Sequence, residues 1–235
     1  MARIPDPTVP AGFPIRGWFA ESDPSFRREM LALARPKSYA AGSVIYQAGD
    51  PGRDVFGVRS GVVTLTGKFT HPDAVLLHML RPGEWFGTVP VLVERSRRIT
   101  AIARTDVELL RVPGDQLRAL LRSHPEWVIE LGRDLAYYMD LGMQTASDLL
   151  IRNASARCAA VLLRLAGRRW ASGPDADLPS EIPASQTELA MLCNLSRNTF
   201  SRVAKEFTNR QLVTLSYRSL TVDDPARLRE VADAG

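Results

Sequence analysis

The sequence predicts an α+β fold: an N-terminal double-stranded β-roll, a long helix and a C-terminal winged helix-turn-helix. Three observations predict it. Short apolar runs, interrupted by Gly or Asp about every ten residues, fill the first half of the chain and are typical of a small closed β-structure. A helical period begins at Asp115. Two amphipathic segments joined by a small polar turn follow near the C-terminus, and a hairpin pattern comes after them.

Composition places the chain among soluble globular proteins. It has 235 residues, of which 45% are hydrophobic and 24% are charged, and its net charge is +4. This mild excess of base permits a nucleic-acid partner without requiring one. No apolar run approaches the roughly 20 residues of a membrane span, and the N-terminus lacks a signal-peptide core. We therefore expect a cytoplasmic protein with no membrane partner.

Cysteine and histidine are too few for a built metal site. The two cysteines, Cys158 and Cys193, stand far apart and have no His near either, so no iron–sulfur cluster is expected and both thiols should be buried. The histidines His71, His78 and His124 are scattered. An enzyme built on the β-segment would need a His/Glu cluster there, and this pattern offers none. We expect no metal and no enzymatic activity.

The N-terminal half divides into an arm and a domain. Residues 1–17 are Pro-rich and predict an extended arm. Residues 18–124 form the predicted β-roll domain, which begins with a short helix over Asp23–Arg35 and ends with another from Asp115. Between them, alternating apolar residues predict strands, and Gly57 and Gly61 permit tight bends.

Residues 125–153 predict one long helix with a heptad pattern. Its seam residues alternate steps of three and four: Val128, Leu131, Leu135, Tyr138, Gly142, Thr145 and Leu149. Gly142 would cost about 1 kcal/mol in a lone helix but lets two backbones approach closely. Either a single helix packs on its own core or two copies pair along this seam. The unusual length favours a homodimer.

Asn153, Ala154 and Ser155 end this helix and are the predicted hinge. Ser155 is the predicted cap of a new helix, which opens the DNA-binding domain, residues 154–235. Ala171–Ser185 reads as a connector rich in Gly, Pro and Asp.

The segment from Ser185 to Val222 carries the helix-turn-helix pattern. The small Ala190 allows a second helix to cross the first closely, Asn194 tolerates a left-handed turn, and Ser196 stands at an N-cap position. Apolar residues on one face of the second helix are Phe200, Val203, Ala204 and Phe207. A solvated basic helix would explain the charges on its other face, but not the turn, the cap and the following hairpin together.

The polar face suits a DNA groove. Arg can bind guanine and Asn can bind adenine through paired hydrogen bonds, at about 1–3 kcal/mol of discrimination each, while Ser and Lys can hold phosphates. Double-stranded DNA is therefore the predicted partner. The predicted contact residues are Thr187, Ser196, Arg197, Asn198, Ser201, Arg202, Lys205 and, at the tip of the hairpin, Arg218.

These residues and several longer stretches resemble the Crp–Fnr family of bacterial transcription regulators. The resemblance runs from about Trp18 to Leu228 and rests on AGSVIYQAGDPGRDVFGVRSGVVTL, LRPGEWFG, RITAIARTDVELLRV and LSRNTFSRVAKEF. It implies an effector-binding β-roll, a dimerisation helix, a winged helix, a pseudo-palindromic operator and contact with RNA polymerase. Where the family often has Glu in the recognition helix, this chain has Asn198, and Asn194 replaces the usual Gly of the turn. The half-site should therefore differ from that of the cyclic-AMP receptor protein.

The effector segment also departs from the family pattern. The resemblance implies Gly83, Glu84, Gly87, Thr88, Val89, Arg97 and Arg98 as candidate effector-binding residues. Thr88 stands where cyclic-nucleotide binders carry the Glu that grips ribose, and Arg98 replaces the Ser or Thr beside the phosphate-binding Arg, here Arg97. Cyclic AMP is thus disfavoured. Cyclic GMP, another anion held by the arginines, or no ligand at all remain open, the last with the β-roll as a scaffold for partner contacts.

Overall fold

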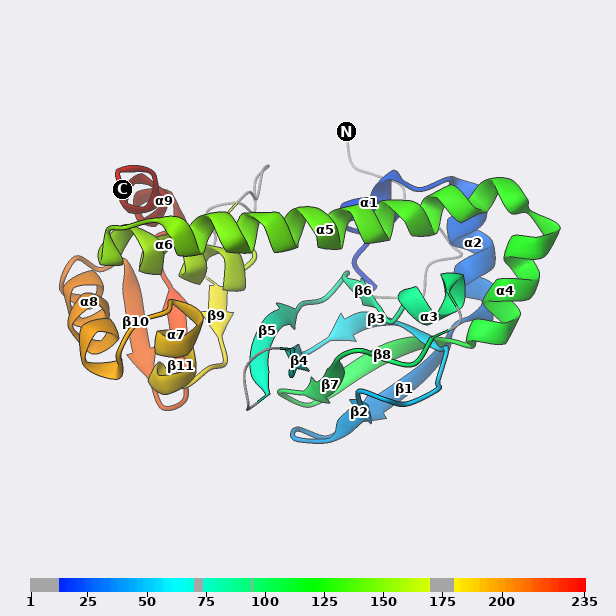
Figure 1. Ribbon diagram of the computed structural model, residues 1–235, viewed down its shortest axis with the longest axis horizontal. Coiled ribbons are helices and arrows are strands. Elements are labelled where there is room, and N and C mark those ends of the chain that lie inside the picture. The colour runs from blue at the N-terminus through cyan, green and yellow to red at the C-terminus, as the bar shows by residue number, and fades with distance from the viewer. Residues whose placement is uncertain (1–12, 70–73, 94, 170–179) are drawn as a thin grey trace. The chain divides into compact units, whose positions relative to one another are not determined.

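A computed structural model describes residues 13–69, 74–93, 95–169 and 180–235 (Figure 1). Most of the predicted arm, His71 and most of the predicted connector lie outside these ranges. Contacts divide the chain into two compact units, Met1–Asp140 and Leu141–Gly235, with the boundary inside helix α5, Val128–Leu150. Each unit is described separately.

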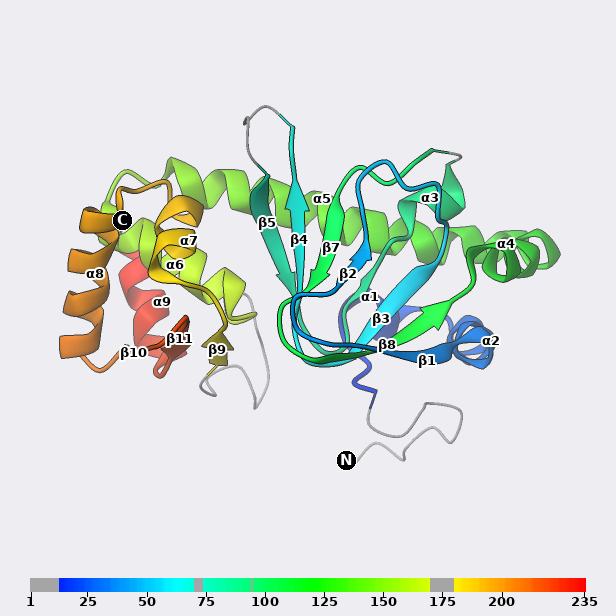
Figure 2. The same ribbon diagram turned by 90° about the horizontal axis from the view of Figure 1, so that it is seen from below.

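The first unit contains two four-stranded antiparallel sheets, which Figure 2 shows side by side. In the first sheet the order is β1 (Arg35–Tyr39), β8 (Val107–Val112), β3 (Val55–Ser60) and β6 (Trp85–Phe86). In the second it is β2 (Val44–Tyr46), β7 (Thr100–Ala103), β4 (Val63–Gly67) and β5 (Val75–Leu80). Apart from β4 and β5, which follow one another along the chain, neighbouring strands in each sheet are distant in sequence, as a rolled sheet requires. The predicted β-roll is confirmed.

The interior of the roll is aromatic and aliphatic. Tyr46, Phe56 and Phe86 pack with ring centroids 5.3–6.1 Å apart, and buried Val, Leu and Ala side chains from both sheets surround them. Gly61, between β3 and β4, has φ +80°, and a Cβ there would lie 2.2 Å from the carbonyl oxygen of Asp106. Only glycine fits this bend, as its spacing in the sequence suggested.

Short helices cover the outer side of the first sheet. They are α1 (Gly17–Glu21), α2 (Pro24–Leu33), α3 (Val89–Leu92), α4 (Gly114–Ser123) and the 3₁₀ turn η1 (Pro125–Trp127). Two of them, α2 and α4, are the helices expected from the sequence. Side chains from these helices and from α5 form a second core around Phe19, Phe26 and Trp85. This core holds the first turns of α5 against the roll.

The second unit is a winged helix-turn-helix, as predicted. Its elements are α6 (Ala154–Leu165), β9 (Ser180–Ile182), α7 (Gln186–Leu192), α8 (Arg197–Asn209), β10 (Val213–Ser216), β11 (Ser219–Val222) and α9 (Pro225–Asp233). The strands form an antiparallel sheet in the order β10, β11, β9. Pattern reading of the sequence missed β9 and α9. It also misplaced one cap, because the Asn153 side chain, rather than that of Ser155, accepts from the first free amides of α6.

Helix α5 has apolar residues on two faces, and the predicted seam mixed them. Leu131 is fully buried in the core of its own unit, and the Tyr138 hydroxyl donates to the carbonyl of Trp85. Leu131 therefore packs within its own protomer, and its place in a dimer seam stays a prediction. Exposed apolar side chains lie elsewhere on the helix: Ile129 and Met139 are each 61% exposed, and Met143 is 57% exposed. Periodicity alone could not tell which face covers the protomer's own core.

Candidate functional site

The turn between α7 and α8 is built as the sequence suggested. Asn194 has φ +51°, in the left-handed region, and its amide donates to the carbonyl of Met191 at 2.9 Å. The next amide, of Leu195, reaches the carbonyl of Ala190 at 2.9 Å, and Ala190 itself is 2% exposed. The small residue thus lets the turn fold back tightly on α7.

Helix α8 is capped at one end and anchored along one face. The Ser196 hydroxyl accepts from the amide of Thr199 at 3.1 Å. The predicted apolar face is buried, since Phe200, Val203, Ala204 and Phe207 are each at most 4% exposed. These contacts fix the axial rotation of α8 and hence determine which side chains face solvent.

The opposite face of α8 is free for a ligand. All eight predicted DNA-binding residues are exposed: Thr187, Ser196, Arg197, Asn198, Ser201, Arg202, Lys205 and Arg218. Among the described residues, Arg197, Arg202 and Lys205 form no ion pair, whereas Arg210 at the far end of α8 lies 3.5 Å from Glu206. The structure therefore leaves three cations of the helix unneutralised on one polar surface.

At the tip of the hairpin, Tyr217 lies beside Arg218 but was not among the contact residues predicted from the sequence. Ser216 pairs with Ser219, so Tyr217 and Arg218 alone form the turn. Arg218 has φ +56°, a conformation that costs a non-glycine residue about 1 kcal/mol. Tyr217 is 92% exposed. An aromatic residue in a two-residue turn, directly before a basic one, was the available signal.

In the β-roll, the guanidinium of Arg97 is already bound within the protein. It donates to the backbone carbonyls of Gly87, at 2.8 Å, and of Asp54, and it lies 4.2 Å from the ring centroid of Tyr46. Only 5% of Arg97 is exposed. Arg98, by contrast, is exposed, with its guanidinium 5.8 Å from the ring centroid of Phe69. The two candidate arginine side chains therefore lie in different surroundings, one buried and one exposed.

Glu84 belongs to a second polar cluster, beneath α5. Its carboxylate accepts from the amide of Arg81 at 2.6 Å and from the hydroxyl of Tyr137 at 3.0 Å, and lies 3.5 Å from His78. Burial alone would raise the pKa of Glu84, but these partners outweigh it and hold the pKa below its ordinary value. Gly83, beside it, has φ +95°. Through Tyr137, Glu84 thus forms a hydrogen bond to α5.

Asp134 is the most perturbed acid of this cluster. It is 1% exposed, and burial raises its pKa to about 7 although Thr88 and Trp18 oppose the rise. The charge of Glu84 raises the pKa of Asp134 further. The predicted effector residue Thr88 is itself 2% exposed. A carboxylate on the inward stripe of an amphipathic helix was the sequence signal that could have revealed Asp134.

Asp134→Asn should change how stability depends on pH. Because the folded-state pKa lies above the ordinary value of 3.8, the native protein binds the proton more tightly, and stability falls as pH rises from about 4 to about 7. Each tenfold difference in proton affinity corresponds to about 1.4 kcal/mol. Urea unfolding between pH 4.5 and pH 7.5 should show this decline in the wild type and lose most of it in the variant. Glu126→Gln, at an exposed carboxylate, is the control. If the free energy of unfolding changed with pH in the same way in the wild type and in Asp134→Asn, the raised pKa could not belong to Asp134.

Two further properties concern only the described residues. They contain no group of three or more His, Cys, Asp or Glu side chains placed to hold a metal ion. None of the helices that the structure describes combines the length and apolar character of a bilayer span.

Comparison with known proteins identifies the two parts of the chain. Residues 36–124 match the cyclic nucleotide-binding domain family, and residues 156–231 match the Crp-like helix-turn-helix domain family. The cyclic AMP receptor protein of Thermus thermophilus is 31% identical over 202 residues, covering 86% of this chain and 90% of that protein. The chain belongs to the CRP/FNR family of transcriptional regulators.

Other CRP/FNR relatives match over most of their length. The CRP-like cAMP-activated global transcriptional regulator of Mycobacterium tuberculosis is 26% identical over 90% of this chain and 94% of that protein. A solved CRP/FNR regulator from Thermus thermophilus, TTHA1359, has a TM-score of 0.63 and 26% identity over 85% of this chain and 98% of that one. The predicted family and the predicted class, DNA-binding transcription regulation, are confirmed. The ligand of the β-roll is not specified by these matches.

Arg218→Gly tests whether the wing tip serves DNA rather than the fold. Glycine relieves the left-handed strain but adds freedom to the unfolded chain, so the melting temperature should stay at or above that of the wild type. Loss of one phosphate contact should lower the salt slope of DNA binding by about 1. Binding titrations over a range of salt, with Arg218→Lys as the charge-retaining control, measure this. A lower melting temperature with unchanged DNA binding would show a structural role instead.

Proposed function

We propose that the protein is a homodimeric, sequence-specific regulator whose α8 helices enter successive major grooves of double-stranded DNA. The observation that carries the proposal is the free face of α8, where exposed Arg197, Asn198 and Arg202 stand on a capped and anchored helix. Residues near the start of a recognition helix contact base edges. We infer that these three side chains read bases, while Ser196, Ser201 and Lys205 hold phosphates, with Thr187 and the wing residue Arg218.

The exposed apolar face of α5 supports the homodimer. Its residues repeat in steps of three and four, and we call them the exposed stripe: Ile129, Gly132, Ala136, Met139, Met143, Ala146 and Leu150. Small residues alternate with methionines, which permits close helix approach. A second copy presents the same stripe by symmetry, so the repeat is self-complementary. Each position of this proposed seam lies one residue after a position of the seam predicted from the sequence. Leu135, Gly142, Thr145 and Leu149 remain predictions beside it.

We propose that the β-roll does not hold a cyclic nucleotide through Arg97. Some relatives are named for cyclic AMP, whereas a relative from Synechocystis, 24% identical over 87% of this chain and 92% of that protein, is named a global nitrogen regulator. The geometry of this protein supports a β-roll that, unlike the relatives named for cyclic AMP, does not bind a cyclic nucleotide through this arginine. Arg97 is engaged by two carbonyls and a ring, and Thr88 supplies no carboxylate for ribose. The effector, if there is one, is then recognised by other residues.

Thermal shift with cyclic AMP and cyclic GMP tests this part. A ligand at about 100 times its Kd would stabilise the protein by about 2.7 kcal/mol, so real binding is easily seen. We expect no shift. A shift that disappears in Arg97→Met would overturn the proposal.

Contact with RNA polymerase, a cytoplasmic location and the absence of enzymatic activity belong to the same proposal. They follow from family membership and from the requirement that a regulator work where the chromosome is transcribed. The operator should be pseudo-palindromic, because a two-fold dimer presents two equivalent helices.

In vitro selection of bound DNA tests the function as a whole. Wild-type protein should enrich paired half-sites about one helical turn apart, with a base at the Asn198 position that differs from the family's familiar one. The double variant Arg197→Ala, Arg202→Ala should enrich no sequence while retaining its fold. Selection that yields no motif with the wild type would refute the proposal.

A further inference from the structure

The corner between α5 and α6 is closed by a buried ion pair. Asp148, in the last turn of α5, lies 3.1 Å from Nε of Arg164 in α6, and neither side chain is more than 5% exposed. Arg169 lies 3.9 Å from the same carboxylate and bonds Asp233 of α9 at 2.7 Å. Separating such a pair would leave uncompensated buried charge, which is costly. The end of α5 is therefore held firmly to the DNA-binding unit.

Arg157 links this corner to the helix-turn-helix. Its Nη1 donates to the carbonyl of Ile151, the residue directly after α5, at 2.6 Å. Its Nε donates to the carbonyl of Cys193, at 2.9 Å, in the turn that leads into α8. One rigid, planar guanidinium thus holds two segments that lie 42 positions apart in sequence.

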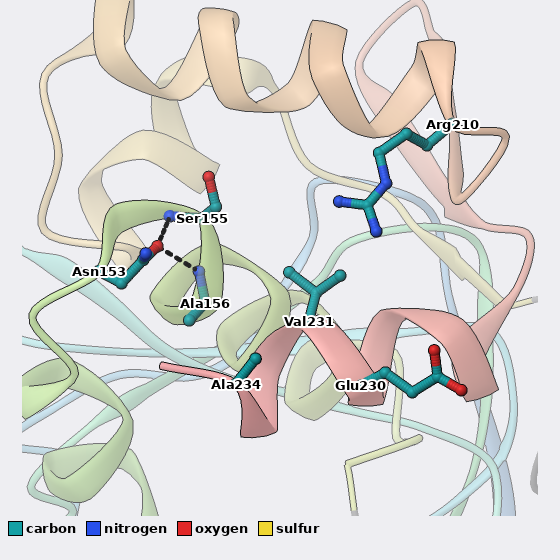
Figure 3. A pocket seen from close by; sticks show the side chains of 7 residues that line it. All are labelled: Asn153, Ser155, Ala156, Arg210, Glu230, Val231 and Ala234. Carbon is teal, nitrogen blue, oxygen red and sulfur yellow. Dashed lines mark hydrogen bonds between the residues drawn. The ribbon is translucent and has the colours of Figure 1, made fainter.

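Further hydrogen bonds tie the corner at Asn153 and Ile151. The Asn153 side chain accepts from the amides of Ser155 and Ala156, at 2.9 and 3.1 Å, as Figure 3 shows. The amide of Ile151 reaches the carbonyl of Asp148 at 3.3 Å. Beside the cap lies an open hollow of about 290 Å³ lined by residues of α6 and α9 and by Arg210. Solvent reaches this side, so the stiffness of the corner rests on its hydrogen bonds and the ion pair.

We propose that Arg157 and the Asp148–Arg164 pair make the end of α5, the corner and the turn before α8 one rigid piece. Arg157 is then a positioning residue for the recognition helix, acting through the carbonyl of Cys193. On this proposal, the hinge motion expected at Asn153–Ser155 takes place elsewhere. When the end of α5 moves, α8 therefore moves with it as part of the same rigid body, and the corner between them does not flex. The proposal rests on the DNA-binding dimer proposed above, in which rigid corners fix the spacing between the two recognition helices.

Operator spacing provides the functional test. Full-length Arg157→Met keeps the apolar stem but loses both hydrogen bonds. We expect its preference for the selected operator, over one with a base pair inserted between the half-sites, to fall at least tenfold. Affinity for a single half-site should stay within about twofold, since base contacts add independently of dimer spacing. Arg152→Met, at an exposed arginine of the same corner, should behave as wild type. Unchanged spacing selectivity, or an equal loss on all DNA, would overturn the proposal.

Hydrogen exchange gives a readout that does not depend on DNA. In the wild type, peptides covering residues 151–157 and 193–197 should both be protected. Arg157→Met should speed exchange in both together, by at least tenfold, and Arg152→Met in neither. If Arg157→Met does not fold, Asp148→Asn serves as the second variant and should loosen the first peptide. Rapid exchange of these peptides in the wild type would refute the rigid corner even if DNA binding holds. Failure to select an operator, with the peptides protected, would refute the proposed function alone.

Discussion

Met139→Glu is expected to convert the dimer into a monomer and to abolish binding to paired half-sites. Met139 is 61% exposed in the protomer and stands near the middle of the exposed stripe of α5. In the proposed dimer the two Met139 side chains lie close to the two-fold axis, so the variant would bury two like charges without partners. A loss of at least about 100-fold in dimer affinity corresponds to some 2.7 kcal/mol, well within that cost. Sedimentation equilibrium of wild type and variant measures it.

A matched control separates the seam from a general effect of added charge. Val44 in β2 is also an exposed apolar residue, at 44%, and Val44→Glu should remain dimeric. Both variants should melt close to the wild-type monomer value at low concentration, because neither side chain is buried in its protomer. A monomer produced by Leu135→Glu but not by Met139→Glu would support the seam predicted from the sequence instead.

Arg197→Ala and Arg202→Ala should each weaken binding to the selected operator by about 1–3 kcal/mol, or about 5- to 150-fold. Both guanidiniums are exposed on the free face of α8 and form no ion pair among the described residues, so each can bind a guanine edge through two hydrogen bonds. Non-specific DNA should be affected far less, which relaxes specificity. Fluorescence anisotropy with operator and scrambled duplexes measures the two affinities.

Two other variants of the same helix make this test specific. Lys205→Ala should weaken all sequences alike and reduce the salt slope by about 1, as a phosphate contact does. Arg210→Ala removes an equal charge at the far end of α8, where Glu206 already partners it, and should leave operator binding nearly unchanged. Equal losses at Arg197 and Arg210 would indicate a general electrostatic effect and contradict base reading.

The helix-turn-helix was predictable almost residue by residue. The cap at Ser196, the left-handed Asn194 and the buried face of α8 all follow from interactions that span four residues or fewer. The β-roll was also predictable. Apolar and polar residues alternate along its strands because successive side chains point to opposite faces of a sheet, and regularly spaced glycines mark the bends between strands. The outer helices α1 and α3 were not, because each has too few residues for a period to emerge.

The surroundings of Arg97, Arg157 and Asp134 depend on contacts between residues far apart in sequence. Arg97 is engaged by the carbonyl of Asp54, 43 positions away, and Arg157 by that of Cys193, 36 positions away. Backbone carbonyls occur at every residue, so nothing in the sequence marks the two that are used. Asp134 acquires its raised pKa because it is buried and, to a lesser extent, because Glu84, 50 positions away, lies near it.

Helix α5 shows most clearly which properties follow from the sequence and which depend on the tertiary structure. Its length, its amphipathic character and the polar face of α8 were determined by the amino-acid sequence alone, through local periodicity and capping. Whether Leu131 or Met139 faces the protomer's own core was decided only by the tertiary structure. The reason is physical: both faces of α5 are apolar, and removing either from water gains a similar free energy per unit area, so only the packing of the β-roll and its helices selects which face is covered.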